Sequence, residues 1–130
     1  ALQPGIEIRT ASTDRARVLE VSYNLTATAG SAWTLGIGRP AAIGITPTSP
    51  ITFLAENPAD PVSTVTSAIA WGTAPTAPTA FFRRFRYFGV VELQWRFDEG
   101  IVIGVSSSIV AQWAIVGTNI ATAFYCVVSE

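Results

Sequence analysis

Apolar and polar residues alternate along several stretches of the chain, and the clearest alternation covers residues 17–26. One face of this segment carries the apolar side chains Leu19, Val21, Tyr23 and Leu25, and the other carries the polar side chains Glu20, Ser22 and Asn24. Successive side chains of a β-strand point to opposite faces, so a period of two predicts a strand with one face turned toward a core. We expect residues 17–26 to form such a strand.

The rest of the chain repeats this pattern in shorter pieces. Further strands are predicted at 32–38, 51–55, 61–72, 81–89, 90–98, 100–105, 108–116 and 121–129. Proline-rich stretches at 40–61 and 73–78 predict irregular loops, because proline cannot donate a hydrogen bond to a sheet. No stretch shows a sustained helical period with caps. The pattern predicts an all-β chain with a single domain over residues 1–130, a jelly-roll-like antiparallel β-sandwich, and an extended N-terminal arm at residues 1–13.

The composition adds an expectation about association. The 130 residues are 49% hydrophobic and 13% charged, and this charged fraction lies well below the usual value of about one quarter. A domain of this size has a large surface for its volume, so one copy cannot bury so much apolar surface by itself. We therefore predict a homo-oligomer. The net charge of -1 provides no general attraction to nucleic acid or to anionic lipid.

Residues 101–129 carry no charge, and their length would allow a membrane-spanning helix. Several polar residues interrupt the segment, namely Ser106, Ser107, Ser108, Gln112, Thr118 and Asn119. The remaining residues are rich in β-branched side chains, which favour strands. We predict strands joined by turns in this region and no membrane association.

The residue types needed for catalysis are scarce. The chain has no His, which is the commonest general base and the commonest metal ligand, and its single Cys126 sits in an apolar run that predicts a buried strand position. Asp98 and Glu99 are adjacent, so on a strand they would point to opposite faces and would not converge on one substrate. The segment Gly36-Ile37-Gly38 lacks the rest of a phosphate-binding signature. We predict neither an enzyme nor a bound cofactor or metal.

The most distinctive segment is residues 81–88, where arginines alternate with aromatic residues. Such a segment could stack the bases of single-stranded nucleic acid, or bind a glycan, or be an ordinary strand. Arginine and aromatic residues are also enriched in subunit interfaces. On a strand, Phe82, Arg84, Arg86 and Phe88 would share one face, and Phe81, Arg83, Phe85 and Tyr87 the other. We predict a contact between subunits, and no nucleic-acid binding.

The predicted interface includes Arg83, Arg84, Phe85, Arg86, Arg39, Leu2 and Ile6. Three arginines within four residues repel one another unless acidic groups neutralise them, so we expect Glu20, Glu92 or Glu130 of a neighbouring copy to do so. The tryptophans Trp33, Trp71, Trp95 and Trp113 have apolar neighbours, so core or interface packing is a better explanation for most of them than sugar stacking.

Short segments along the whole chain carry a resemblance to a known family. They are RVLEV at 17–21, GIGRPA at 36–41, TPTSP at 46–50, FRR at 82–84, WRF at 95–97, GIVI at 100–103 and YCVVSE at 125–130. In these segments the chain resembles the small jelly-roll proteins encoded among the head genes of tailed phages, which include trimeric capsid cement (decoration) proteins. One departure is Asp98-Glu99, at a position where we would expect a turn that contains proline.

The resemblance implies a fold and a role rather than any catalytic residue. It implies a homotrimer that is made in the host cytoplasm, lies on the exterior of the virion capsid, and braces neighbouring subunits of the major capsid protein. Two alternatives remain open at this point. One is a carbohydrate-binding jelly roll, such as a phage receptor-binding or lectin-like module, and the other is a subunit of a non-viral shell or fibre.

Overall fold

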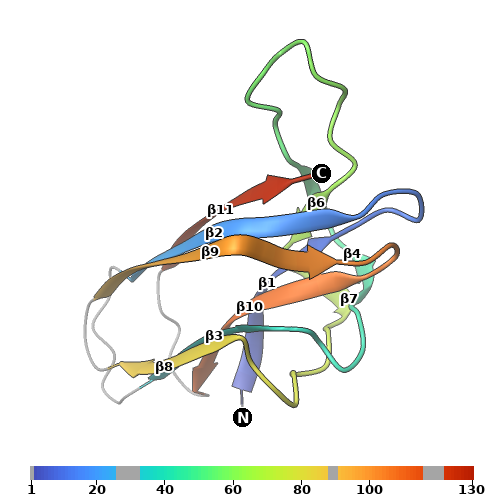
Figure 1. Cartoon of the computed structure of the whole chain (residues 1–130). Helices are drawn as coiled ribbons and strands as arrows, with labels where there is room; N and C mark the ends of the chain where they lie inside the picture. Colours follow the sequence, from blue (N-terminus) through green and yellow to red (C-terminus); the bar gives the residue numbers. More distant parts are fainter. Residues whose placement is uncertain (1, 26–32, 88–90, 116–121) are drawn as a thin grey trace.

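The computed structural model describes residues 2–25, 33–87, 91–115 and 122–130, and this part of the chain is built from strands (Figure 1). The strands are β1 (Leu2–Arg9), β2 (Ala16–Leu25), β3 (Trp33–Gly38), β4 (Ile45–Pro47), β5 (Ile51–Thr52), β6 (Thr66–Ala68), β7 (Trp71–Thr73), β8 (Arg83–Tyr87), β9 (Val91–Ile103), β10 (Ser108–Ile115) and β11 (Thr122–Ser129). None of the described residues is helical, so no helix there could span a membrane. The predicted all-β fold class is confirmed.

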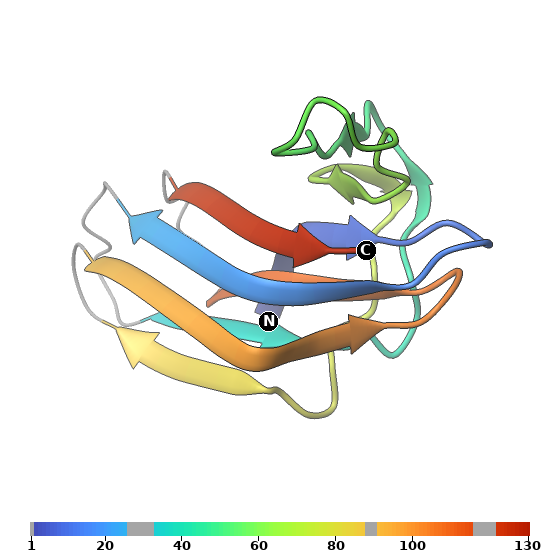
Figure 2. The ribbon, with the colours of Figure 1, turned by 45° about the horizontal axis from the view of Figure 1, so that its top comes forward.

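Two sheets face each other across a common core (Figure 2). The larger sheet has the strand order β5-β6-β1-β10-β3-β8, the smaller has the order β11-β2-β9, and a two-stranded sheet pairs β4 with β7. The antiparallel pairs are nested: β1 pairs with β10, β2 with β9, β3 with β8, β4 with β7 and β5 with β6. The first half of the chain therefore runs back against the second half.

The core forms where the period of two turns apolar side chains inward from both sheets. The larger sheet contributes Ile8, Leu35, Ile37 and Ile109, and the smaller contributes Val18, Val21, Tyr23, Trp95, Ile101 and Ile103. A polar contact also crosses this layer: the Tyr23 hydroxyl donates a hydrogen bond of 3.0 Å to the carbonyl oxygen of Gly36. The sandwich is thus held by apolar burial and also by a direct bond between its two sheets.

A β-bulge in β2 alters the predicted faces of this strand. Val21 and Tyr23 are buried as predicted, but Val18 takes the core position that the alternation assigned to Leu19. Val127 and Val128 of β11 pair with Glu20 and Val18, so Leu19 is an extra residue in the ladder. An extra residue shifts the alternation by one, which turns Leu19 away from the core. The side chain of Leu25, predicted to share this face, lies outside the described part.

β9 is one continuous strand where the sequence predicted two, at 90–98 and 100–105. Leu19 of β2 stands opposite residues 97–100 of β9, which include Asp98 and Glu99, and pairing resumes at Ile101. Gly100 has a φ of 74°, a left-handed conformation that glycine adopts without a steric penalty. β9 therefore bends at this point and stays one strand.

The N-terminal segment is extended, as predicted, and most of it is a paired strand of the larger sheet. Residues 2–9 form β1, which lies inside the larger sheet between β10 and β6. Ile6 packs against the core cluster, and Ile8 belongs to it. β1 pairs with β10 along its length and with β6 at residues 7–9, so this segment is part of the sheet.

A buried carboxylate attaches the β4–β7 sheet to the outer face of the larger sheet. Glu7 is 0% exposed and points away from the core, on the face of β1 opposite Ile8. Among the described residues, four groups donate to it: Arg9 Nη1 at 2.8 Å, the Ser108 hydroxyl at 2.8 Å, the Gly44 backbone nitrogen at 3.0 Å and Trp71 Nε1 at 3.1 Å. A buried charge is tolerated when it is paired and hydrogen-bonded, and here both conditions are met.

Gly44 is required for this arrangement because the backbone approaches the larger sheet closely. A Cβ at this position would lie 2.4 Å from Trp71 Cδ1 and 3.1 Å from Glu7 Oε1. The Arg9 guanidinium also donates to the Gly44 carbonyl oxygen at 2.7 Å. Gly44 therefore binds Glu7 through its backbone nitrogen and Arg9 through its carbonyl oxygen.

We expect Glu7→Gln to lower the free energy of unfolding by about 3–5 kcal/mol, because it removes the charge that neutralises Arg9 and turns an amide nitrogen toward groups that are all donors. Urea denaturation followed by tryptophan fluorescence measures the change. The matched control is Glu99→Gln, at an exposed position of β9, which should shift stability by less than about 0.5 kcal/mol. Equal stability of the two variants would contradict the role given to Glu7.

Candidate functional site

The predicted interface segment forms β8, which is one edge of the larger sheet and lies beside β9, an edge of the smaller sheet (Figures 1 and 2). Phe85 and Arg83 pair with Leu35 and Ile37 of β3, whose side chains are in the core. Paired residues share a face, so Phe85 and Arg83 point toward β9. There the rings of Phe85 and Trp95 are 5.8 Å apart, and the Arg83 guanidinium lies 5.2 Å from the centre of the Phe97 ring.

Arg84 and Arg86 lie on the opposite, outer face of β8, as the alternation predicted. Phe81 was predicted to share the face of Arg83, and this is wrong, because the strand begins only at Arg83. The Phe81 ring instead covers Gly36 on the outer face, where an added Cβ would lie 2.7 Å from its Cδ1 atom. The Arg84 guanidinium stacks 5.0 Å from the centre of this ring. Phe88 lies outside the described residues.

Arg39 joins the same region from the end of β3. Its guanidinium lies 4.7 Å from the centre of the Phe82 ring, and its Nη2 donates a hydrogen bond of 2.7 Å to the carbonyl oxygen of Val102 in β9. We call the resulting surface the arginine–aromatic edge. It consists of Arg39, Phe81, Phe82, Arg83, Arg84, Phe85 and Arg86.

The arginine–aromatic edge carries positive charge that no acid neutralises within the described part of the chain. The ion pairs there are Arg9–Glu7 and Arg96–Glu20, and neither involves the edge. The edge holds four of the eight arginines of the chain. Its aromatic side chains are also partly open to solvent, since Phe82 is 38% exposed and Phe85 48%. This combination of unpaired arginines and half-exposed rings is typical of a binding surface.

Two of the three predicted acidic partners are already bound within their own chain. Glu20 accepts hydrogen bonds from Gln94 Nε2 at 2.7 Å and from Arg96 Nε at 3.2 Å. Glu130 accepts from the Ser63 hydroxyl and from the backbone nitrogens of residues 64 and 65. Glu92 is exposed on β9. Glu20 and Glu130 are therefore unsuited to neutralise the arginines of another copy.

The other predicted site residues are in different places. Ile6 packs against the core, and the side chain of Leu2 lies outside the described part. Trp95 is in the core, which agrees with its predicted packing role, and Trp71 covers Glu7. The side chains of Trp33 and Trp113 are not among those described.

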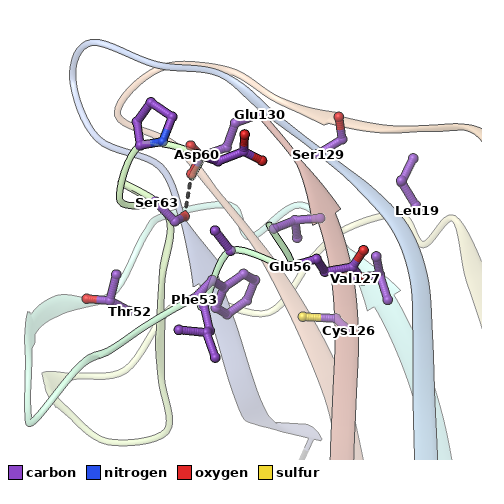
Figure 3. A pocket seen from close by; sticks show the side chains of 14 residues that line it. Leu19, Thr52, Phe53, Glu56, Asp60, Ser63, Cys126, Val127, Ser129 and Glu130 are labelled. Carbon is purple, nitrogen blue, oxygen red and sulfur yellow. Dashed lines mark hydrogen bonds between the residues drawn. The ribbon is translucent and has the colours of Figure 1, made fainter. Parts of the chain in front are cut away.

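A groove on the far side of the sandwich was not predicted from the sequence (Figure 3). It has a volume of about 830 Å³ and lies between β11 and the long segment that joins β5 to β6. Apolar walls come from Leu19, Phe53 and Leu54, and three acidic residues line it: Glu56, Asp60 and Glu130. We call it the acidic groove. The proline-rich composition of residues 40–61 predicted an irregular loop, but it gave no indication that this loop folds back against β11.

The groove holds the only thiol of the chain, that of Cys126, which was predicted to be buried and is half-buried. Burial raises the pKa of Cys126 from its ordinary value of 9.0 to about 12, because desolvation disfavours the thiolate. At neutral pH the group is a thiol and a poor nucleophile. Among the described residues, no three His, Cys, Asp or Glu side chains are grouped so that they could hold a metal ion.

Comparisons with known proteins add no family or fold assignment. No protein-family model matches the chain, and no curated protein or solved structure gives a significant match.

We expect Cys126 to be alkylated by iodoacetamide at least about a hundredfold more slowly in the folded chain than in the urea-unfolded chain at the same pH. The raised pKa also means that the folded state keeps the proton longer than the unfolded state. The contribution of the protonated Cys126 thiol to the free energy of unfolding is fully present below pH 9.0, and it declines as the pH rises toward about 12. Cys126→Ala should remove that part of the decline in alkaline urea titrations, and equal alkylation rates in the two states would contradict the assignment.

Proposed function

We propose that this chain is a structural subunit of a virion: a capsid cement, or decoration, protein of a tailed bacteriophage. In this role it forms a homotrimer on the capsid exterior and braces neighbouring subunits of the major capsid protein. The arginine–aromatic edge carries the proposal. It exposes phenylalanine and arginine side chains at the β8 edge of the larger sheet, and an isolated molecule would leave this surface in water.

The strand pairing supports the fold that goes with this role. We infer a jelly roll, which is an antiparallel hairpin rolled into two sheets. The nested pairs from β1–β10 to β5–β6 are those of such a rolled hairpin, and they divide between the two larger sheets and the β4–β7 sheet. Jelly rolls are common in viral capsid proteins.

A bracing protein stabilises a shell by burying surface at the junctions between subunits, and it needs no catalytic group. Arginine suits such junctions because its guanidinium is weakly hydrated and makes two parallel hydrogen bonds with a carboxylate. All eight basic residues of this chain are arginine. The rings of Phe81, Phe82 and Phe97 hold the guanidinium groups in place, which lowers the entropy lost when a partner binds.

The trimer is tested by sedimentation equilibrium at micromolar concentration. We expect three times the chain mass of 13.8 kDa, which is about 41 kDa. A mass of 13.8 kDa at all concentrations would contradict self-association. Attachment to a capsid is tested separately, by electron microscopy of virions labelled with an antibody against the chain, where labelled capsid surfaces are expected.

We expect Arg84→Ala to weaken the trimer or its attachment to the capsid. If the partner carboxylate is buried, removing the arginine leaves it unpaired at a cost of about 2–5 kcal/mol. Arg15→Ala, at an exposed arginine outside the arginine–aromatic edge, is the matched control and should change neither property. The proposal is wrong if Arg84→Ala stays assembled and attached but loses affinity for single-stranded DNA or for a glycan.

A further inference from the structure

We propose that the arginine–aromatic edge of one copy docks into the acidic groove of the next copy. This inference rests on the self-association in the proposed function, and it names the two surfaces that meet. It replaces the acidic partners predicted from the sequence with Glu56 and Asp60, which line the groove.

The topology puts these two surfaces on opposite sides of one molecule. β8 and β5 are the two edges of the larger sheet, and β9 and β11 are the two edges of the smaller sheet. The arginine–aromatic edge lies at β8, beside β9, and the acidic groove lies at β11 and the chain that follows β5 (Figures 1 and 3). The two surfaces cannot touch within one copy, so they can meet only between copies.

The charges of the two surfaces are complementary. Within the described part of the chain, no cation pairs with Glu56 or Asp60, and the polar contact recorded for the Asp60 carboxylate is a hydrogen bond of 3.3 Å from Asn57 Nδ2. Arg84 and Arg86 on the other surface have no acidic partner there. A guanidinium and a carboxylate that leave water together are stabilised only when they pair, so each surface supplies what the other lacks.

The apolar side chains of the two surfaces are also complementary. Leu54 on the rim of the groove is 95% exposed, and Leu19 and Phe53 form walls beside it. On the other surface, the rings of Phe82 and Phe85 are half-exposed. The groove volume of about 830 Å³ falls in the range of about 300–1,000 Å³ that buries drug-sized molecules, so it has room for such side chains.

A contact between two identical edges is less favourable. It would bring Arg83, Arg84 and Arg86 of both copies together, and like charges at an interface oppose association. The contact we propose joins different surfaces, so it is heterologous and leaves one free surface of each kind at the ends of a pair. Repetition closes into a ring if successive copies turn by the right angle, and otherwise it gives an open row.

Two double variants test this contact. Arg84→Glu with Arg86→Glu reverses the edge and keeps the groove, whereas Glu56→Arg with Asp60→Arg reverses the groove and keeps the edge. All four side chains are exposed, so both variants should fold, which circular dichroism checks. We expect each variant alone to associate at least about a hundredfold more weakly than the unaltered chain and to sediment near 13.8 kDa. Arg15→Glu is the matched control and should assemble normally.

An equimolar mixture of the two double variants provides the decisive measurement. One variant keeps an acidic groove and the other keeps a basic edge, and the two reversed surfaces also carry opposite charges. We therefore expect the mixture to assemble to about 28 kDa or more, at least twice the mass of 13.8 kDa, with the two variants in equal amounts. Assembly of either variant alone, or a mixture that stays monomeric, overturns the inference while leaving the trimer intact. A monomeric unaltered chain overturns both proposals. If the unaltered chain forms an open row and neither double variant does so by itself, the result supports this contact and contradicts the trimer.

Discussion

The carboxylate of Glu7 is the interaction on which the arrangement of the layers depends. Its donors come from β1, β7, β10 and the turn before β4, which are distant in the sequence. A buried carboxylate without these donors would cost several kcal/mol, so the donors must come together when the chain folds. The β4–β7 sheet is thereby fixed on the outside of the larger sheet. The chain then continues from β4 to β5, the far edge strand of the larger sheet, and to β6 beside it. The segment between β5 and β6 forms a wall of the acidic groove.

A second set of contacts connects the core to the opposite edge. The Tyr23 ring packs at 5.5 Å against Trp95 and at 5.2 Å against Phe124, and Trp95 in turn contacts Phe85 of β8. Because the Tyr23 hydroxyl is also bonded to Gly36, the ring has a fixed position between the sheets. The arginine–aromatic edge is therefore an extension of the core, and its side chains are held in place before any partner binds.

The sequence indicates the strands well and their partners poorly. Alternation is a local property, so most predicted strands exist, including those near 17–26, 81–89 and 108–116. Pairing is not local: no pattern within residues 2–9 indicates that they form a strand between β10 and β6. The bulge at Leu19 also has no local signal, because only the pairing with β9 and β11 creates it. The acidic groove combines side chains from three distant segments and could not be predicted for the same reason, whereas the arginine–aromatic segment is contiguous and could be singled out from the sequence.

The two sides of the sandwich limit edge-to-edge pairing in different ways. On β9, the side chains of Arg17 and Arg39 donate to the carbonyl oxygens of Glu99 and Val102, which occupies acceptors that a foreign strand would need. At the other side, the chain after β5 folds against β11, and Glu130 binds its backbone nitrogens. At the positions engaged in this way, recognition between copies falls to side chains. Side-chain recognition can depend on charge and shape, so copies can associate at defined surfaces without the unlimited strand addition that open sheet edges promote.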